Sequence, residues 1–306
     1  MKNKKTKNER GSITIFVLTG MMFMLIVLMT AYAGINNKLQ AQNKKIETIK
    51  LQYEGNDIEQ EYKEAKERIK TTISKETSYV GCYADIDNDG TADGIIYADL
   101  AMGNTGSGQW YNSEGTYTIP KEKEGLKEYY VKDENYTSEK SGNTTAKLIA
   151  PIEGSSGTKE RFYVMALEDF NGGTTYNWYN AASGKMSDYS STTSGDFGKG
   201  KANTTTMISK WNNNEYGKQN QFDDMWGVIQ DEVNKGWFVP SRAEWSAFGG
   251  ELEITEDNCE NFGLSVWYWS SSQYDTDAVW CMDISFSEVT FTDTSSDMVV
   301  RLSTTF

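Results

Sequence analysis

The 306-residue sequence contains no histidine, only three cysteines and only three prolines. Without histidine the chain lacks the usual general base at neutral pH, the usual zinc ligand and the Ser-His and Cys-His pairs of hydrolases. Cys82, Cys259 and Cys281 are too few and too scattered for a disulfide framework or a Cys-x-x-Cys metal site. A bridge between Cys259 and Cys281 and three free thiols both stay open. We therefore expect a protein that is not an enzyme.

Positive charge is scarce in most of the chain. Residues 79–306 carry 16 basic and 35 acidic side chains, a net charge of −19, whereas the whole chain has −14. A surface that binds nucleic acid needs clustered Lys and Arg to replace the counterions of the phosphates. We expect no nucleic-acid partner. An acidic surface favours cations or basic partners, although solubility alone explains the same balance.

Charge is absent altogether from residues 12–34, a span of 23 residues that as one helix covers the hydrocarbon core of a bilayer. The basic leader, residues 1–11, carries five Lys or Arg against Glu9, which predicts an inside N-terminus and an outside C-terminus. We expect a membrane-anchored protein whose C-terminal region lies outside the cell. Ala31-Tyr32-Ala33 leaves a cleaved signal and a secreted protein as the alternative.

The residues from Arg10 to Phe16 resemble the N-terminus of type IV pilin-like and Tad-type proteins, in which a basic leader ends in Gly ahead of a long apolar helix. Counting from Ser12, Phe16 stands where a type IV pilin usually has Glu. The resemblance implies an alternative function, a minor pilin-like structural or tip subunit of a surface filament.

Residues 35–78 predict an amphipathic helical stalk. The segment is rich in Lys, Glu and Gln, and its apolar residues recur at three- and four-residue steps with a break near Gly55-Asn56. Such a helix projects as a stalk, self-associates as a short coiled coil or packs on the following domain. The pattern is too brief to choose between these arrangements.

Residues 79–150 change to a Gly-, Asn-, Thr- and Tyr-rich composition that predicts a β-rich region. Within it, carboxylates stand at positions 1, 3, 5 and 9 of a loop with Gly at position 6, the spacing of a tight loop around one calcium ion. The segment resembles the calcium loops between strands of FG-GAP-type repeats. The expected ligands are the side chains of Asp85, Asp87, Asp89 and Asp93 and the carbonyl of Thr91. The cofactor would be a structural calcium ion; an acidic hairpin turn without metal is the alternative.

The region 151–306 alternates strand and helix signals. Arg161–Leu167 has the continuous apolar character of a central strand, and residues 171–221 have the composition of loops. A helix is expected from Phe222, with an apolar face reaching Val233 and a stop at Gly236.

A second helix is expected from Ser241, because Glu244 stands three residues later in the spacing of a capping box, and it should bury Trp245 and Phe248. The aromatic residues of this region invite a sugar-binding interpretation, but their positions on this helix and in alternating strands favour the core. The tryptophans expected in the core are Trp237, Trp245, Trp267, Trp269 and Trp280.

The order of an apolar strand, the Pro240-to-Trp245 helix start, Tyr268-Trp-Ser-Ser and a terminal Val-Arg strand resembles the C-type-lectin-like fold. It is most similar to the bacterial surface-protein branch, with the major paralogous domain proteins and the variable proteins of diversity-generating retroelements. The resemblance implies an α+β fold, two helices packed on short antiparallel sheets, and a surface-displayed ligand-binding protein. Formylglycine-generating enzymes share the fold and a similar signature, but Cys259 and Cys281 do not sit in a matching motif.

The resemblance also implies that residues 262–306 form a variable region rewritten by a retroelement, which copies template adenines unfaithfully. Sixteen Asn occur between 79 and 261 and none from 262 to 306, as expected if Asn codons were replaced. Alternation from Val279 to Val289 predicts a strand with Trp280, Met282, Ile284 and Phe286 buried and the other face free. Fixed edge strands are the alternative.

The ligand, an extracellular protein or another cell-surface molecule, would contact this predicted variable surface. Its residues are Tyr274, Asp275, Thr276, Asp277, Val279, Cys281, Asp283, Ser285, Ser287, Val289, Thr292, Asp293, Thr294, Ser295, Ser296 and Asp297. Small polar residues and Tyr suit adaptable recognition, since Tyr supplies contact area with little loss of entropy.

Overall fold

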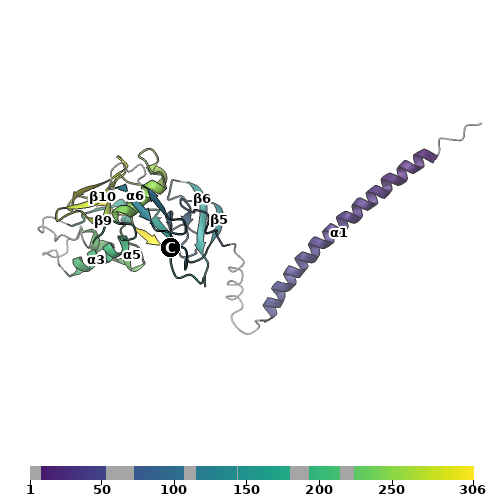
Figure 1. Ribbon diagram of the computed structural model, residues 1–306, viewed down its shortest axis with the longest axis horizontal. Coiled ribbons are helices and arrows are strands. Elements are labelled where there is room, and N and C mark those ends of the chain that lie inside the picture. The colour runs from purple at the N-terminus through teal and green to yellow at the C-terminus, as the bar shows by residue number, and fades with distance from the viewer. Residues whose placement is uncertain (1–7, 53–71, 107–114, 143, 180–192, 214–223) are drawn as a thin grey trace, which may run out of the picture. The chain divides into compact units, whose positions relative to one another are not determined.

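The computed structural model describes residues 8–52, 72–106, 115–142, 144–179, 193–213 and 224–306. The chain divides into two compact units, residues 1–68 and residues 69–306 (Figure 1). The boundary predicted between residues 150 and 151 is wrong, because strands from both sides of it share one sheet of the second unit.

The first unit contains α1, Asn8–Gln52, an uninterrupted helix of 45 residues. Its stretch Val17–Ile46 is long and apolar enough, by length and composition, to cross a membrane, and none of it is buried within the protein. The hydroxyl of Thr30 donates to the carbonyl of Val27 at 3.1 Å, so this polar group is satisfied inside the helix, as a hydrocarbon environment requires. The helix continues from the predicted membrane segment into the predicted stalk. The break predicted near Gly55 lies outside the described residues.

The second unit is a mixed α+β unit whose largest sheet has six strands. In spatial order they are β13 (Ser303–Thr305), β7 (Phe162–Ala166), β2 (Gly94–Asp99), β1 (Tyr83–Ala84), β6 (Thr145–Pro151) and β5 (Tyr129–Thr137). Only β1 and β6 are parallel neighbours within this sheet. Because β7 lies between β13 and β2, the prediction of a central strand at 161–167 is confirmed.

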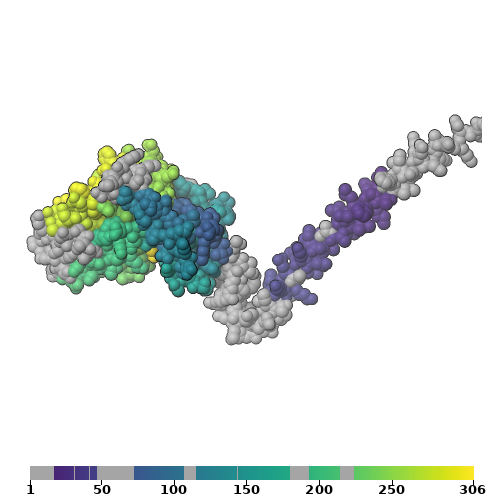
Figure 2. Space-filling view, in the orientation of Figure 1, coloured from purple at the N-terminus to yellow at the C-terminus, as the bar shows by residue number. Residues whose placement is uncertain are grey.

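A second sheet has five strands and belongs mostly to the C-terminal part of the chain. In order they are β11 (Glu288–Asp293), β10 (Ala278–Asp283), β9 (Trp267–Gln273), β12 (Met298–Val299) and β8 (Thr175–Tyr176). Figure 2 shows the yellow C-terminal residues together on the surface of this unit. A small sheet pairs β3 (Asn104–Gly106) with β4 (Tyr117–Ile119).

Helices lie between the strands of the two larger sheets in sequence. The α-helices are α3 (Gly200–Asn212), α4 (Met225–Val228), α5 (Gln230–Asn234) and α6 (Arg242–Glu251), and two 3-10 turns are η2 (Phe170–Gly173) and η4 (Cys259–Phe262). The predicted capping box of α6 is confirmed, because Ser241 and Glu244 each bind the other's backbone N–H with a side-chain oxygen. Trp245 and Phe248 are buried, as expected.

The structure differs from the sequence prediction at two helices. Residues 200–212 form a helix where composition indicated loop, because burial of Asn203, Thr204 and Met207 outweighs the weak helix propensity of Asn and Thr. The single helix predicted from Phe222 is two short helices beginning at Met225, and Phe222 itself lies outside the described residues. Gly236 does end this segment, with a φ of 104° that favours glycine.

The tryptophan and cysteine predictions are partly confirmed. Trp245, Trp269 and Trp280 are buried, whereas Trp267 is 36% exposed and its assignment to the core is wrong. Trp237 is only half-buried and packs at the side of one core cluster. All three cysteines are free thiols, so Cys259 and Cys281 form no bridge.

Candidate functional site

The predicted calcium loop follows β1 and brings three of its carboxylates together. Asp85, Asp87 and Asp89 each have a carboxylate oxygen within 4.8 Å of the other two. Asp85 is fully buried, whereas Asp87 and Asp89 are exposed. Asn88 and Gly90 have φ angles of 62° and 104°, which tighten the loop around these oxygens.

Asp93 is not one of these three carboxylates, and the carbonyl of Thr91 stays a predicted ligand. Asp93 accepts a hydrogen bond from the N–H of Ile86 at 2.7 Å, and burial raises the pKa of Asp93, helped by the negative charges of Asp87, Asp85 and Asp89. The side-chain and backbone donors of Thr91 bind Asp89 and lower the pKa of that carboxyl. Asp93 thus stands apart from the three converging carboxylates, and its role as a calcium ligand stays a prediction.

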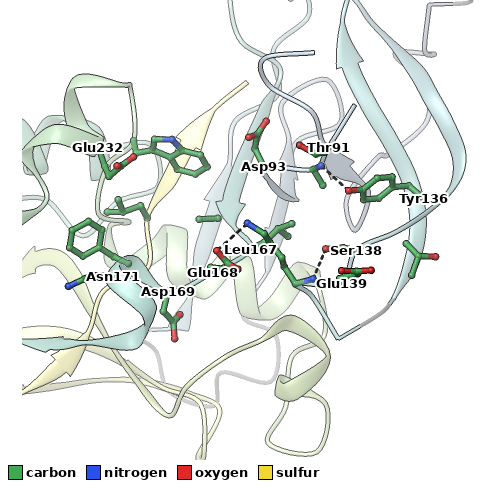
Figure 3. A pocket seen from close by; sticks show the side chains of 17 residues that line it. Thr91, Asp93, Tyr136, Ser138, Glu139, Leu167, Glu168, Asp169, Asn171 and Glu232 are labelled. Carbon is green, nitrogen blue, oxygen red and sulfur yellow. Dashed lines mark hydrogen bonds and ion pairs between the residues drawn. The ribbon is translucent and has the colours of Figure 1, made fainter. Parts of the chain in front are cut away.

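Beyond the loop lies a cleft of about 950 Å³, which we name the acidic cleft. Figure 3 shows Tyr136 and Ser138 on one wall and Asn171 and Glu232 on the other. Its lining comes from segments far apart in sequence. The residues are Thr91, Ala92, Asp93, Tyr136, Thr137, Ser138, Glu139, Lys140, Ala166, Leu167, Glu168, Asp169, Phe170, Asn171, Glu232, Trp237 and Leu302.

Among the described residues, five carboxylates and one lysine line the acidic cleft. Lys140 pairs with Glu168 at 3.2 Å at exposed positions, and the half-buried Glu232 pairs with the exposed Lys235 at 2.8 Å. Asp169 is held by Arg301 at 2.8 Å. Asp93 and Glu139 have no cationic partner among the described residues. The cleft therefore suits a cationic group, and it offers no histidine or cysteine for catalysis.

A second candidate surface lies on the predicted variable region, at β9, β10 and β11. The rings of Tyr274 and Phe291 stack with centroids 4.3 Å apart and planes 3° apart, and they are 43% and 49% exposed. Trp280 meets both rings edge-on from its buried position, and the guanidinium of Arg242 lies 4.7 Å from its ring centre. We name Tyr274, Trp280 and Phe291 the aromatic platform.

The sixteen residues of the predicted variable surface divide by burial. The exposed ones are Tyr274, Asp275, Asp277, Asp293, Ser295 and Asp297, and the half-buried ones are Thr276, Ser285, Thr292 and Ser296. The prediction is wrong for the six buried residues, Val279, Cys281, Asp283, Ser287, Val289 and Thr294.

The physical reason is that β10 is covered on both faces. Val279 and Cys281 pack in one core cluster, whereas Trp280 and Met282 pack in another. The predicted open face does not exist. Phe286, predicted to be buried, is 70% exposed in the turn between β10 and β11.

Neither Cys259 nor Cys281 lies in surroundings that favour a reactive thiolate. Burial raises the pKa of Cys281 to about 12, assisted by Asp283 and Glu288, and burial also raises the pKa of Cys259. A thiolate, the nucleophilic form of cysteine, is therefore disfavoured at neutral pH.

Sequence reasoning missed the acidic cleft and part of the aromatic platform. The cleft residues carry no local motif, since Tyr136, Asp169, Glu232 and Trp237 meet only in the fold. Phe291 lies within the predicted variable window, residues 262–306, which is the signal that could have found it. The structure places it on the edge strand β11.

Comparisons with known proteins add little to this geometry. No protein-family model and no curated protein matches the chain. Among solved structures, the chain is similar to a fimbrial protein from Bacteroides ovatus at 17% identity and a TM-score of 0.34. The match covers 48% of this chain and 36% of that protein's chain.

Proposed function

We propose that this protein is anchored by α1 in a bacterial membrane and displays residues 69–306 outside the cell, where the aromatic platform binds a protein ligand. The observation that carries the proposal is the stacked pair Tyr274 and Phe291, two large rings left about half exposed beside the buried Trp280 of β10. Exposed aromatic groups of this kind are typical of interaction surfaces.

The platform is preorganised, which lowers the entropy lost on binding. Trp280 supports both exposed rings from below, and Arg242 supports Trp280 in turn. In the loop after β9, the carboxylate of Asp275 accepts hydrogen bonds from the N–H groups of Asp277 and Ala278 at 2.8 and 2.9 Å.

Acidic side chains lie on the loops beside the platform and indicate the chemistry of the partner. Asp275 and Asp277, in the loop after β9, and Asp293, at the end of β11, are exposed. An apolar centre with an acidic rim fits a protein whose surface presents an apolar group surrounded by Lys or Arg. Such a partner would bind more weakly at high salt, because the rim charges are screened.

The platform proposal is tested with the full chain in detergent micelles on an array of extracellular proteins. The double variant Tyr274→Ser/Phe291→Ser should lose at least about tenfold in affinity for any captured protein, since central aromatic anchors dominate binding energy. The matched control is Asp93→Asn/Glu139→Gln, which alters the acidic cleft and should bind as the wild type does. Loss of binding in the control with retention in the platform variant would move the ligand site to the cleft.

The C-type-lectin-like assignment and the variable region belong to the same proposal. The antiparallel pairing of β7 with β13, the capped helix α6 and the β9-β10-β11 sheet agree with the plan of that fold. Variation would then be confined to the exposed and half-buried residues, because changes at the six buried ones would disturb a core. Sequencing the flanking DNA tests this: we expect a near-copy of codons 262–306 that differs at template adenines, beside a reverse-transcriptase gene. Finding neither would leave a fixed binding surface.

A filament subunit is the second candidate function, and the unbroken 45-residue helix α1 favours it. A helix that runs from an apolar stretch into a polar one suits side-by-side packing in a filament as well as a single anchor. Immunogold labelling of intact cells separates the two. Periodic labelling along filaments would support the subunit, uniform labelling of the envelope would support the anchored receptor, and recovery only from the medium would indicate a secreted protein.

A further inference from the structure

The two carboxylate oxygens of the buried Asp85 have different surroundings. Oδ2 accepts hydrogen bonds from the N–H of Gly90 at 2.9 Å and from the ammonium of Lys132 at 2.6 Å. Oδ1 is buried and has no hydrogen-bond partner, and the side chain is 0% exposed. Burial of a carboxylate oxygen without a hydrogen-bond donor costs free energy. A cation bound to this atom would remove that cost.

Further oxygens for such a partner lie close by. Asp85, Asp87 and Asp89 present carboxylate oxygens within 4.8 Å of one another. Calcium binds oxygens at about 2.3–2.6 Å, so two ligands on opposite sides of one ion lie about 5 Å apart. The three carboxylates therefore already have the spacing of ligands around a single calcium ion. Because Asp87 and Asp89 are exposed, water can complete the coordination.

A positive charge is already tied to this loop from β5. The ammonium of Lys132 also donates to the backbone oxygen and to the side-chain oxygen of Asn88 at 2.8 and 2.9 Å. The hydroxyl of Tyr130, two residues earlier on β5, donates to the same side-chain oxygen at 3.1 Å. Lys132 thus pairs with Oδ2 of Asp85, and Oδ1 stays available to a second cation.

We propose that the loop 85–90 binds one calcium ion through Oδ1 of Asp85 together with Asp87 and Asp89, and that Lys132 sets the affinity of this site. The ammonium repels the incoming ion, because the two positive charges share one carboxylate. It also holds the loop in place when calcium is scarce. The site is therefore a weak one, in the range of extracellular calcium modules.

The proposal is tested by calorimetric titration of calcium chloride, up to about 10 mM, into the full chain in detergent micelles. We expect one ion per chain. Asp87→Asn/Asp89→Asn should weaken binding at least about tenfold, because two of the three carboxylates lose their charge. Both side chains are exposed, so this variant should fold as the wild type does, and an equal Tm in EDTA checks that it does.

The role of Lys132 is tested by Lys132→Met, which should bind calcium at least about tenfold more tightly and melt at a lower temperature than the wild type in EDTA. The matched control is Lys159→Met, which removes an exposed lysine paired with Glu122, away from the loop, and should leave the affinity unchanged. No calcium binding by the wild type would overturn the site. Equal calcium affinity of Lys132→Met and the wild type would overturn the role of Lys132.

Magnesium provides a further control, since it requires near-ideal octahedral geometry and gives up its water reluctantly. A site with three carboxylates on a tight loop should prefer calcium. Equal affinity for magnesium and calcium would identify a diffuse acidic surface and contradict the proposed coordination.

Discussion

The two large sheets of residues 69–306 bury most of their polar groups in different ways, although the ion pair of Arg301 with Asp169 also bonds to Tyr268 of the five-stranded sheet. In the six-stranded sheet, the guanidinium of Arg161 makes two bonds of 2.8 Å to the carboxylate of Asp99, with 2% and 1% of the two side chains exposed. In the five-stranded sheet and the helix beside it, buried tryptophans donate their indole N–H groups to backbone carbonyls. These are Trp178 to Ser270, Trp245 to Trp269, and Trp269 to Tyr176, at 2.7–3.0 Å.

The difference bears on the proposed binding surface and on whether it could vary without loss of the fold. A buried ion pair depends on two particular side chains, and removal of either leaves a charge in the core. An indole that donates to a backbone carbonyl depends on one side chain only, because every residue has that carbonyl. The five-stranded sheet is therefore fixed from its interior, and under the proposal the exposed residues of β11 and its loops are the ones that would vary.

The largest effect is expected from Arg161→Met, which should lower the free energy of unfolding by about 3–5 kcal/mol because Asp99 is left charged and buried. Chemical denaturation of the full chain measures this loss. Lys140→Met, which breaks the exposed pair with Glu168, is the control and should cost less than about 1 kcal/mol. Similar losses in the two variants would show that burial of the Arg161 pair adds little, which would remove the six-stranded sheet's side of the contrast.

The next effect is a dependence on pH that comes from Glu244 in the capping box. Burial raises the pKa of Glu244 to about 7 from its ordinary 4.5, although hydrogen bonds from Ser241, Gly200 and Gly198 lower it. Between these two pH values the folded chain holds a proton that the unfolded chain has lost. The contribution of Glu244 to stability should therefore be full below about pH 4.5 and fall by roughly 3 kcal/mol as the pH rises to about 7.

Denaturation midpoints at several pH values measure this slope. In Glu244→Gln the group no longer titrates, so the slope between pH 4.5 and pH 7 should flatten, whatever the absolute stability of the variant. An unchanged slope would assign the pH dependence to other carboxyls, such as Asp93.

A smaller effect is expected from Trp269→Phe in the five-stranded sheet. The variant loses the bond to the carbonyl of Tyr176 and part of a buried ring, which should cost about 2 kcal/mol. Trp267→Phe, on the same strand but 36% exposed, is the control and should cost less than half as much. Equal costs would mean that burial of the indole N–H matters little.

The smallest effect on stability is expected at the aromatic platform. Tyr274→Ser and Phe291→Ser should each lower the free energy of unfolding by less than about 1 kcal/mol, because both rings are about half exposed. Thermal melting of each variant checks this value. A loss of several kcal/mol would show that the stacked rings belong to the core and would remove the main argument for a binding surface.

Features encoded by neighbouring residues could be predicted from the sequence. The spacing of Ser241 and Glu244 defined the start of α6, and the apolar run at 161–167 defined β7. The spacing of Asp85, Asp87 and Asp89 brought three carboxylates together as expected. In each case local geometry alone determines the arrangement.

Features that depend on distant partners could not be predicted. The helix α3 exists because Asn203 donates to Ser194 and Ser271, and because Thr204 bonds with Val239, contacts that no local propensity encodes. Alternation along β10 indicated one open face, but two separate cores cover the strand. The acidic cleft likewise requires segments that are distant in sequence to meet.

The position of β13 beside β7 has a consequence for the timing of folding. Ser303–Thr305 pair with residues 163–165, and the hydroxyls of Tyr97 and Ser303 bond at 3.0 Å across more than two hundred residues. The six-stranded sheet therefore lacks one of its edges until residues 303–305 have left the ribosome. Contacts of such long range fold slowly, because loop closure must precede any gain from pairing. During synthesis the strand β7 has an unpaired edge that can pair with other chains. Pairing with β13 covers this edge and so protects the unit from aggregation.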